Sequence, residues 1–213
     1  MTYTAKQIRR ALVDAALSEW RRPVDAYADA DRITEYFRGI GWDWAIDEHC
    51  PDGVYDEEIR RTTDAPLDYC GIGLAWVGVH RLPYFVEPGQ CVSVRMCEGV
   101  ASTVMPSTLR KDKRGDLEFW DEIPQDPPEP VDVDDLRRGD IITVETSRGL
   151  DYGDHFALVY EPADTVVTIE WNASGELGDG ERGRGVVMRT REYDEIRRVI
   201  RLDDEHFETG GHQ

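Results

Sequence analysis

Hydrophobic positions in the first twenty residues repeat with the period of an α-helix. They fall three and four residues apart, on one helical face: Ile8, Ala11, Leu12, Ala15 and Ala16. Thr4 and Gln7 match a capping box at the start of this pattern, and Pro23 stops it. The sequence therefore predicts a first amphipathic helix that begins after Thr4 and packs its apolar face inward.

Two more helices are predicted in the first 81 residues. The second covers about residues 28–38 and ends at Gly39, and the third begins near Cys70 and runs through Trp76 and Val77. Between them, the acidic stretch of residues 41–66 shows no helical period and is predicted to be an irregular loop. Residues 81–120 carry only a weak helical pattern near 92–100.

The periodicity changes after a proline-rich segment, residues 123–130, which is predicted to be extended, polyproline-like and exposed. Short β-rich runs separated by Gly, Pro, Asp and Ser follow it at residues 140–145, 155–161, 166–172, 185–190 and 196–202. The predicted class is α+β, with N-terminal helices packed on a C-terminal antiparallel sheet of about five strands. A single domain is predicted over residues 1–213, with a helical part at about 5–120, a connector at 121–135, the sheet at 138–202 and a frayed tail at 203–213.

The charge balance excludes some partners. The chain has 44 acidic and 25 basic residues, a net charge of -19, and would be repelled by nucleic acid. Such a surface suits a salt-loving source, because salt screens self-repulsion, but an acidic protein from an arginine-rich genome fits equally. No export signal is recognised at the N-terminus, and no apolar run approaches the roughly 18 residues of a membrane span.

The four cysteines are too few for a disulfide scaffold in a chain of 213 residues and lack CxxC spacing. Cys50, Cys91 and Cys97 are therefore predicted to be buried free thiols. A zinc site built from His80, Cys91 and Cys97 fits no usual finger spacing. No metal or cofactor is expected.

Cys70 differs from the other cysteines because it falls in the first turn of a predicted helix, beside Gly71 and Gly73. A helix N-terminus or an adjacent imidazolium favours a reactive thiolate, and first-turn N–H groups can stabilise an oxyanion. His155 would be the general base, although a histidine at a strand start also serves as a structural residue. Strand alternation places Glu170 and Asn172 on one face, where either could orient the imidazole. The predicted reaction is acyl transfer to water.

Four motifs in this order resemble the CHAP family, the cysteine, histidine-dependent amidohydrolases/peptidases. They are the aromatic-Cys element with a tryptophan six residues later, the D-L-x-x-G-D entry at residues 135–140, the strand beginning at His155, and the I-E-x-N strand at 169–172. The resemblance spans about residues 8 to 191. It implies a nucleophile at Cys70, a base at His155, an orienting Glu170 and a supporting Asn172.

The resemblance also implies a substrate, because family members cut amide bonds in peptidoglycan and many occur in bacteriophage lysins and tail proteins. The expected protein is a virus-encoded cysteine amidase or endopeptidase acting at the cell envelope. It would be associated with the virion, where other tail proteins are the expected partners, or present in the host cytoplasm before release. A non-catalytic virion protein with this fold, and an intracellular deamidase or isopeptidase effector, remain open.

Two departures from the family pattern affect the site. Trp171 stands where a small residue often lies between Glu and Asn. Some phage members bind calcium through aspartates ahead of the cysteine, but the spacing here does not match, so no calcium is expected: Asp47, Asp52, Asp56 and Glu57.

Overall fold

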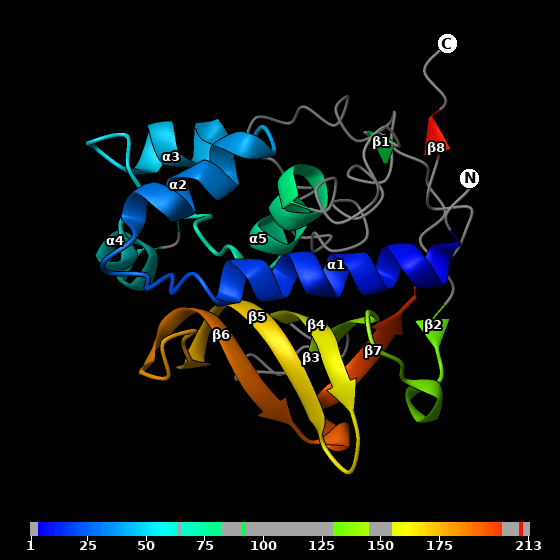
Figure 1. Ribbon diagram of the computed structural model, residues 1–213. Coiled ribbons are helices and arrows are strands. Elements are labelled where there is room, and N and C mark those ends of the chain that lie inside the picture. The colour runs from blue at the N-terminus through cyan, green and yellow to red at the C-terminus, as the bar shows by residue number, and fades with distance from the viewer. Residues whose placement is uncertain are drawn as a thin grey trace.

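The computed structural model describes residues 4–63, 65–81, 91–92, 130–144, 155–201 and 209–210. Helices form one layer and an antiparallel sheet forms the other, with α1 (Ala5–Trp20) lying along the sheet between them (Figure 1). This confirms the predicted α+β class. Cys97 and most of the proline-rich segment lie outside the described part of the chain, and so do the predictions made for them.

Among the described residues, the helical layer contains four short helices besides α1. They are α2 (Ala30–Gly39), α3 (Asp43–His49), α4 (Glu57–Thr62) and α5 (Cys70–Trp76), and α5 continues into a π-helical turn, η1 (Val77–Arg81). The predicted capping box of α1 is present, because the Thr4 side chain accepts from Gln7 while the Gln7 side chain accepts from the Thr4 backbone. The structure confirms the predicted end of the second helix at Gly39 and the predicted start of the third helix at Cys70.

The prediction of an irregular loop at residues 41–66 is wrong, because α3 and α4 lie there. Asp56 starts α4 by accepting backbone hydrogen bonds from Glu58 at 2.8 Å and Ile59 at 3.1 Å. Acidic residues also occupy the first turn of each helix, where the helix dipole favours them. Each helix is only two turns long or less, too short for a hydrophobic period to show among so many charges.

The sheet has the strand order β2-β7-β3-β4-β5-β6, all pairs antiparallel. Five of its strands match the five predicted runs: β3 (Ile141–Val144), β4 (His155–Pro162), β5 (Val166–Glu176), β6 (Arg182–Arg191) and β7 (Ile196–Ile200). The edge strand β2 (Pro130–Val131) adds a sixth within the predicted connector, followed by the 3-10 turn η3 (Val133–Asp135). A second, two-stranded sheet pairs β1 (Cys91–Val92) with β8 (Thr209–Gly210), which lies in the predicted frayed tail.

Alternation along β4 divides its side chains between two hydrophobic clusters, as predicted. Phe156 and Leu158 belong to the larger cluster, which includes the buried faces of α1, α2 and α5. Ala157 and Val159 belong to a smaller cluster formed with β3 and β7 on the other face of the sheet. The sheet is therefore buried on both faces near the start of β4, which is where His155 lies.

The D-L-x-x-G-D segment forms a buried ion-pair cluster at the entry to β3. The Arg201 guanidinium donates to both oxygens of Asp140, at 2.9 and 2.6 Å, and to Asp135 at 2.8 Å. Gly139 has φ +87°, and a Cβ built there would lie 2.8 Å from Arg9 in α1, so the turn requires glycine. This part of the motif joins β3 to the C-terminal end of β7 and to α1.

Candidate active site

Cys70 is the first residue of α5 and is a free thiol. Its helix is held in the core by fully buried neighbours, Tyr69 and Leu74, and by a close contact between Gly73 and the Trp171 ring of β5. Cys70 itself is 6% exposed. The sequence around it thus fixes the thiol at a helix start directly above the sheet.

His155 is the first residue of β4, where it pairs with Val144 of β3, and it is 7% exposed. Its imidazole is hydrogen-bonded to Glu170 and lies close enough to Cys70 for the thiol to act on the imidazole pKa. The Nε2–H donates to Glu170 Oε2 at 2.9 Å, which leaves Nδ1 as the ring nitrogen for the thiol. Three predicted site residues are therefore in contact, although they come from α5, β4 and β5.

Glu170 lies in the middle of β5, opposite Ala157 of β4, and is fully buried. Besides His155, its carboxylate accepts a hydrogen bond from Thr168 Oγ1 at 2.6 Å. Arg191 of β6 donates to both carboxylate oxygens, Nε to Oε1 at 2.8 Å and Nη2 to Oε2 at 2.7 Å. A buried carboxylate with this many donors stays ionised and keeps one orientation.

The hydrogen bonds shift the pKa values of both groups. Burial alone lowers the pKa of His155, but the Cys70 and Glu170 contacts outweigh burial and raise it from 6.5 to about 9. Burial raises the pKa of Glu170, and hydrogen bonds from His155 and Arg191 outweigh that effect and place the pKa well below 4.5. At neutral pH the site therefore favours an imidazolium beside a carboxylate, which is the charge arrangement that stabilises a thiolate.

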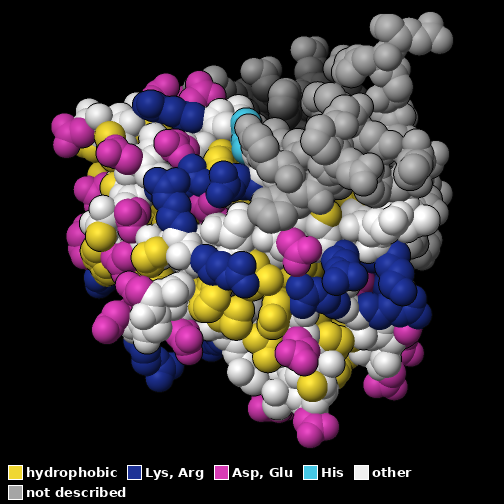
Figure 2. Space-filling view, in the orientation of Figure 1, with side chains coloured by type: hydrophobic (Ala, Val, Ile, Leu, Met, Phe, Trp, Pro, Cys, Tyr) yellow, Lys and Arg dark blue, Asp and Glu magenta, His cyan; other side chains and the backbone are white. Residues whose placement is uncertain are grey.

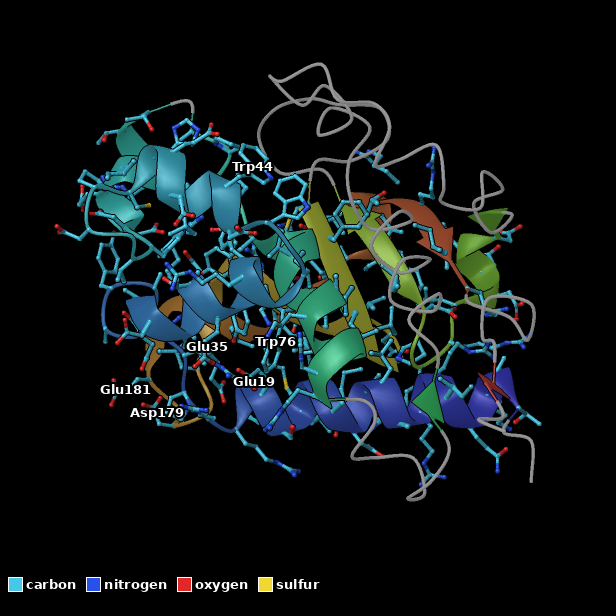
Figure 3. All side chains as sticks on the ribbon, turned by 90° about the horizontal axis from the view of Figure 1, so that it is seen from above. Glu19, Glu35, Trp44, Trp76, Asp179 and Glu181 are labelled. Carbon is cyan, nitrogen blue, oxygen red and sulfur yellow. The ribbon has the colours of Figure 1, made fainter. Side chains whose placement is uncertain are left out.

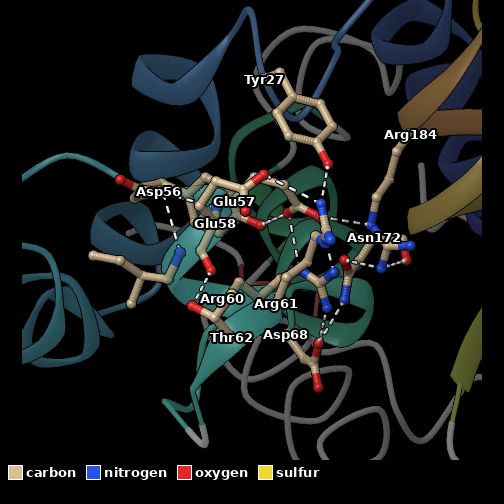
Figure 4. Close-up of polar contacts among 12 residues, drawn as sticks. Tyr27, Asp56, Glu57, Glu58, Arg60, Arg61, Thr62, Asp68, Asn172 and Arg184 are labelled. Carbon is tan, nitrogen blue, oxygen red and sulfur yellow. Dashed lines mark hydrogen bonds and ion pairs between the residues drawn. The ribbon is translucent and has the colours of Figure 1, made fainter.

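Asn172 lies beside this cluster, and its side chain forms hydrogen bonds with Asp68 and Arg184. Its side-chain Nδ2 donates to Asp68 Oδ1 at 2.9 Å, and its side-chain Oδ1 accepts from Arg184 Nη2 at 2.9 Å (Figure 4). Asn172 has φ +57°, and the pairing of β5 with β6 shifts register between Glu170 and Ala173. This irregularity breaks the strict alternation that placed Glu170 and Asn172 together.

The Asp68 and Asn172 pair extends into a network of ion pairs that ties α4 to α5 and β6. Arg60 donates to Asp68 at 3.0 Å, and Arg184 lies 3.0 Å from Glu57 (Figure 4). Asp68 precedes Cys70 by two residues, so the network fixes the backbone just before the thiol. Asn172 thus contributes to the position of α5 rather than to the orientation of His155.

Sequence reasoning missed Arg191 and Thr168 as members of the site. Thr168 and Glu170 are two residues apart in β5, so their side chains are expected on the same face of the sheet, and Thr168 could have been inferred from the sequence. Arg189 and Arg191 are also two residues apart, in β6, and are expected on one face of the sheet. The local sequence therefore does not distinguish Arg191, which is buried, from Arg189, which is exposed. The strand register does not select it either, because Arg189 lies opposite Thr168 and Arg191 lies farther along, opposite Val166. Only the side-chain hydrogen bonds show that Arg191 reaches Glu170.

A second polar cluster lies where α1, α2 and α5 meet, around Glu19 and Trp76 (Figure 3). The buried Glu19 carboxylate accepts from Arg32 at 2.6 and 2.7 Å and from Tyr36 at 2.7 Å. The Arg32 guanidinium lies 4.1 Å from the Trp76 ring centroid. An open hollow of about 550 Å³ borders this cluster and is lined by Asp31, Thr34, Glu35, Arg38, Gly39, Val54 and Trp76. Trp76, which belongs to the family-like motif, therefore packs α5 against α2.

In the described ranges, no cluster of three or more His, Cys, Asp or Glu side chains has a geometry suited to a metal ion. Within the same ranges, no helix is both long and apolar enough to cross a bilayer. The His80 Nε2–H donates a hydrogen bond to Gly39 O at 2.8 Å. Cys97, which the disfavoured zinc site would also need, lies outside the described part of the chain.

Comparison of the chain with protein-family models, curated proteins and solved structures finds no match. Two features of the chain itself therefore point to a function. They are the geometry of Cys70, His155 and Glu170 and the order of the four motifs in the sequence.

Proposed function

We propose that the protein is a cysteine hydrolase, an amidase or endopeptidase, with Cys70 as nucleophile and His155 as general base. The observation that carries the proposal is the placement of Cys70 next to His155, whose imidazole is hydrogen-bonded to Glu170 at 2.9 Å. A nucleophile within reach of a base that a third group orients is the usual arrangement for acyl transfer.

The chemistry follows from the two ring nitrogens of His155. Nδ1 takes the thiol proton, and the Cys70 thiolate attacks the carbonyl carbon of an amide. The tetrahedral oxyanion faces the N–H groups of the first turn of α5, which have no partner within the helix. The intermediate then collapses, the C–N bond breaks, and the imidazolium protonates the leaving amine.

Water completes the cycle. His155 removes a proton from a water molecule, which attacks the thioester carbon. Collapse of the second tetrahedral intermediate releases the carboxylic acid and returns the proton from the imidazolium to the Cys70 sulfur. Throughout, Glu170 keeps Nε2 protonated and the ring in one plane, because its carboxylate accepts the Nε2–H bond.

The substrate we propose is an amide bond of a cell envelope, with peptidoglycan as the first candidate and a virus-encoded lysin or tail protein as the setting. The motif resemblance supports this choice. The net charge of -19 would slow approach to an anionic wall at low salt, and screening at about 1 M salt would remove that barrier. Figure 2 shows basic side chains among the acidic ones on the face that carries α1, so that face is not uniformly repulsive.

The test compares wild type, Cys70→Ala and Cys50→Ala on purified peptidoglycan at about 0.1 and 1 M salt, with release of new amino groups as the readout. Cys50 is a matched control, because it is the other buried free thiol of the described residues and lies at the end of α3. We expect release by wild type and Cys50→Ala, and none by Cys70→Ala.

Other outcomes distinguish the alternative functions. Equal release by wild type and Cys70→Ala, or none by either on peptidoglycan, would count against the envelope enzyme. Ammonia release from protein glutamine that depends on Cys70 would instead identify a deamidase. Copurification with virions and no Cys70-dependent hydrolysis would identify a structural virion protein.

A further inference from the structure

Arg191 is the last residue of β6, and its side chain contacts the same Glu170 carboxylate as His155 does. Its side chain is 3% exposed and makes two charge-assisted hydrogen bonds to the Glu170 carboxylate, at 2.8 and 2.7 Å. Its third contact, Nη1 to Glu195 Oε1 at 2.9 Å, fixes the guanidinium from the opposite side. Glu195 is itself held, because its other oxygen accepts from the Glu192 backbone at 2.8 Å. The guanidinium is thus locked between two carboxylates.

The charged groups around His155 come from five elements. They are Cys70 of α5, His155 itself in β4, Glu170 of β5, Arg191 of β6 and Glu195 of the 3-10 turn η4 (Tyr193–Glu195). Arg191 and His155 share one oxygen, Glu170 Oε2, as hydrogen-bond acceptor. A carboxylate that serves a guanidinium and an imidazole together attracts the imidazole proton less strongly than one that serves the imidazole alone.

We propose that Arg191 is a positioning residue that holds Glu170 in one orientation and draws part of its negative charge away from His155. This inference rests on the proposed function, since the imidazole must both accept a proton from Cys70 and give it to a leaving amine. An isolated buried Glu170 would hold the imidazolium proton too firmly for the second step. Arg191 keeps that proton exchangeable, and its two-pronged contact keeps the ring aimed at the thiol.

The experiment measures the His155 titration midpoint by NMR in the Cys70→Ala protein, where no thiol couples to the imidazole. The His155 signal is assigned by its loss in His155→Gln. In this background Arg191→Met should raise the midpoint by on the order of one pH unit, because a cation within contact of the carboxylate is removed. Arg189→Met is the matched control, since it removes the same charge from the same strand at an exposed position, and its midpoint should not move.

A lysine variant separates charge from geometry and decides the matter if Arg191→Met does not fold. Arg191→Lys retains the positive charge but not the two-pronged contact. In the protein with Cys70 intact, this substitution should lower hydrolysis about tenfold. In the Cys70→Ala protein, it should leave the His155 titration midpoint near that of Cys70→Ala alone. Full hydrolysis by Arg191→Lys would overturn the proposal. So would a midpoint that is unchanged or lowered in Arg191→Met.

The titration needs no substrate, so it separates this inference from the proposed function. If Cys70→Ala hydrolyses peptidoglycan as well as wild type, the proposed function fails while the midpoints can still show the effect of Arg191. If Cys70 is required for hydrolysis but Arg191→Met leaves the midpoint unmoved, only the inference on Arg191 fails.

Discussion

The indole ring of Trp171 fills the space beside Gly73 that any side chain would need. A Cβ built on Gly73 would lie 2.2 Å from Trp171 Cδ1 and 2.5 Å from Cγ. Trp171 is fully buried, so the ring cannot swing into solvent. The contact joins β5, which carries Glu170, to the helix that carries Cys70. The large residue in the I-E-x-N motif therefore packs the element that carries Cys70 against the element that carries Glu170.

Gly73→Ala should destabilise the protein despite the better helix propensity of alanine. The propensity gain is about 1 kcal/mol, while overpacking a buried contact costs about 1–3 kcal/mol or more. We expect a net loss of about 1–2 kcal/mol in the free energy of unfolding, measured by urea denaturation. In the Trp171→Leu background the same substitution should cost much less. Equal costs in the two backgrounds would contradict the contact.

His155→Gln should slow alkylation of the Cys70 thiol by iodoacetamide at pH 7. The substitution removes the imidazole that would accept the thiol proton, and the thiolate is the reactive form. The expected decrease is about tenfold, followed at Cys70 by peptide mass spectrometry so that other cysteines do not interfere. Unchanged alkylation at pH 7 would show that the imidazole does not activate the thiol.

The stabilising effect of His155 should disappear as the pH rises. The pKa of His155 is raised from 6.5 to about 9 in the folded chain, because its contacts with Cys70 and Glu170 outweigh its burial. A raised pKa means that the folded state binds the proton more tightly, so the contribution is full below about pH 6.5 and is lost through pH 9. The measurement is the difference in unfolding free energy between wild type and His155→Gln. That difference should shrink between pH 6.5 and 9, and a constant difference would contradict the shift.

Arg201→Met should destabilise the protein strongly and leave Cys70 chemistry intact. The change leaves the fully buried Asp140 without its cation, which costs about 3–5 kcal/mol. Asp140 lies before Ile141, at the end of β3 away from Val144 and His155. Urea denaturation gives the stability, and alkylation of Cys70 below the unfolding transition gives the reactivity.

Arg137→Met is the matched control for that change. Arg137 also pairs with an aspartate, Asp135, but both side chains are at least half exposed, at 58% and 50%. Exposed pairs contribute about 0–1 kcal/mol, so this variant should unfold near the wild-type urea concentration. A large loss of stability in Arg137→Met would show that exposed charges, rather than the buried pair, stabilise this corner.

The sequence by itself determined the elements whose signals are local. The capping box at Thr4, the helix end at Gly39, the helix start at Cys70 and the five β-rich runs all depend on residues a few positions apart, and each was found where predicted. The alternation of His155 with Phe156 was equally local. These patterns placed Cys70 at the start of a helix, His155 at the start of a strand and Glu170 on one face of a strand. They did not show whether these candidate site residues are in contact.

Only the tertiary structure decided which candidates meet. A register shift after Glu170 accompanies the contact of Asn172 with Asp68. The Glu170 carboxylate binds the Arg191 side chain and not that of Arg189, although Arg189 is nearer to Glu170 in the strand register. Such choices depend on contacts between residues far apart in the chain, which no local period encodes. A buried charge must find its partner wherever folding places it, because an unpaired charge in the interior is too costly to keep.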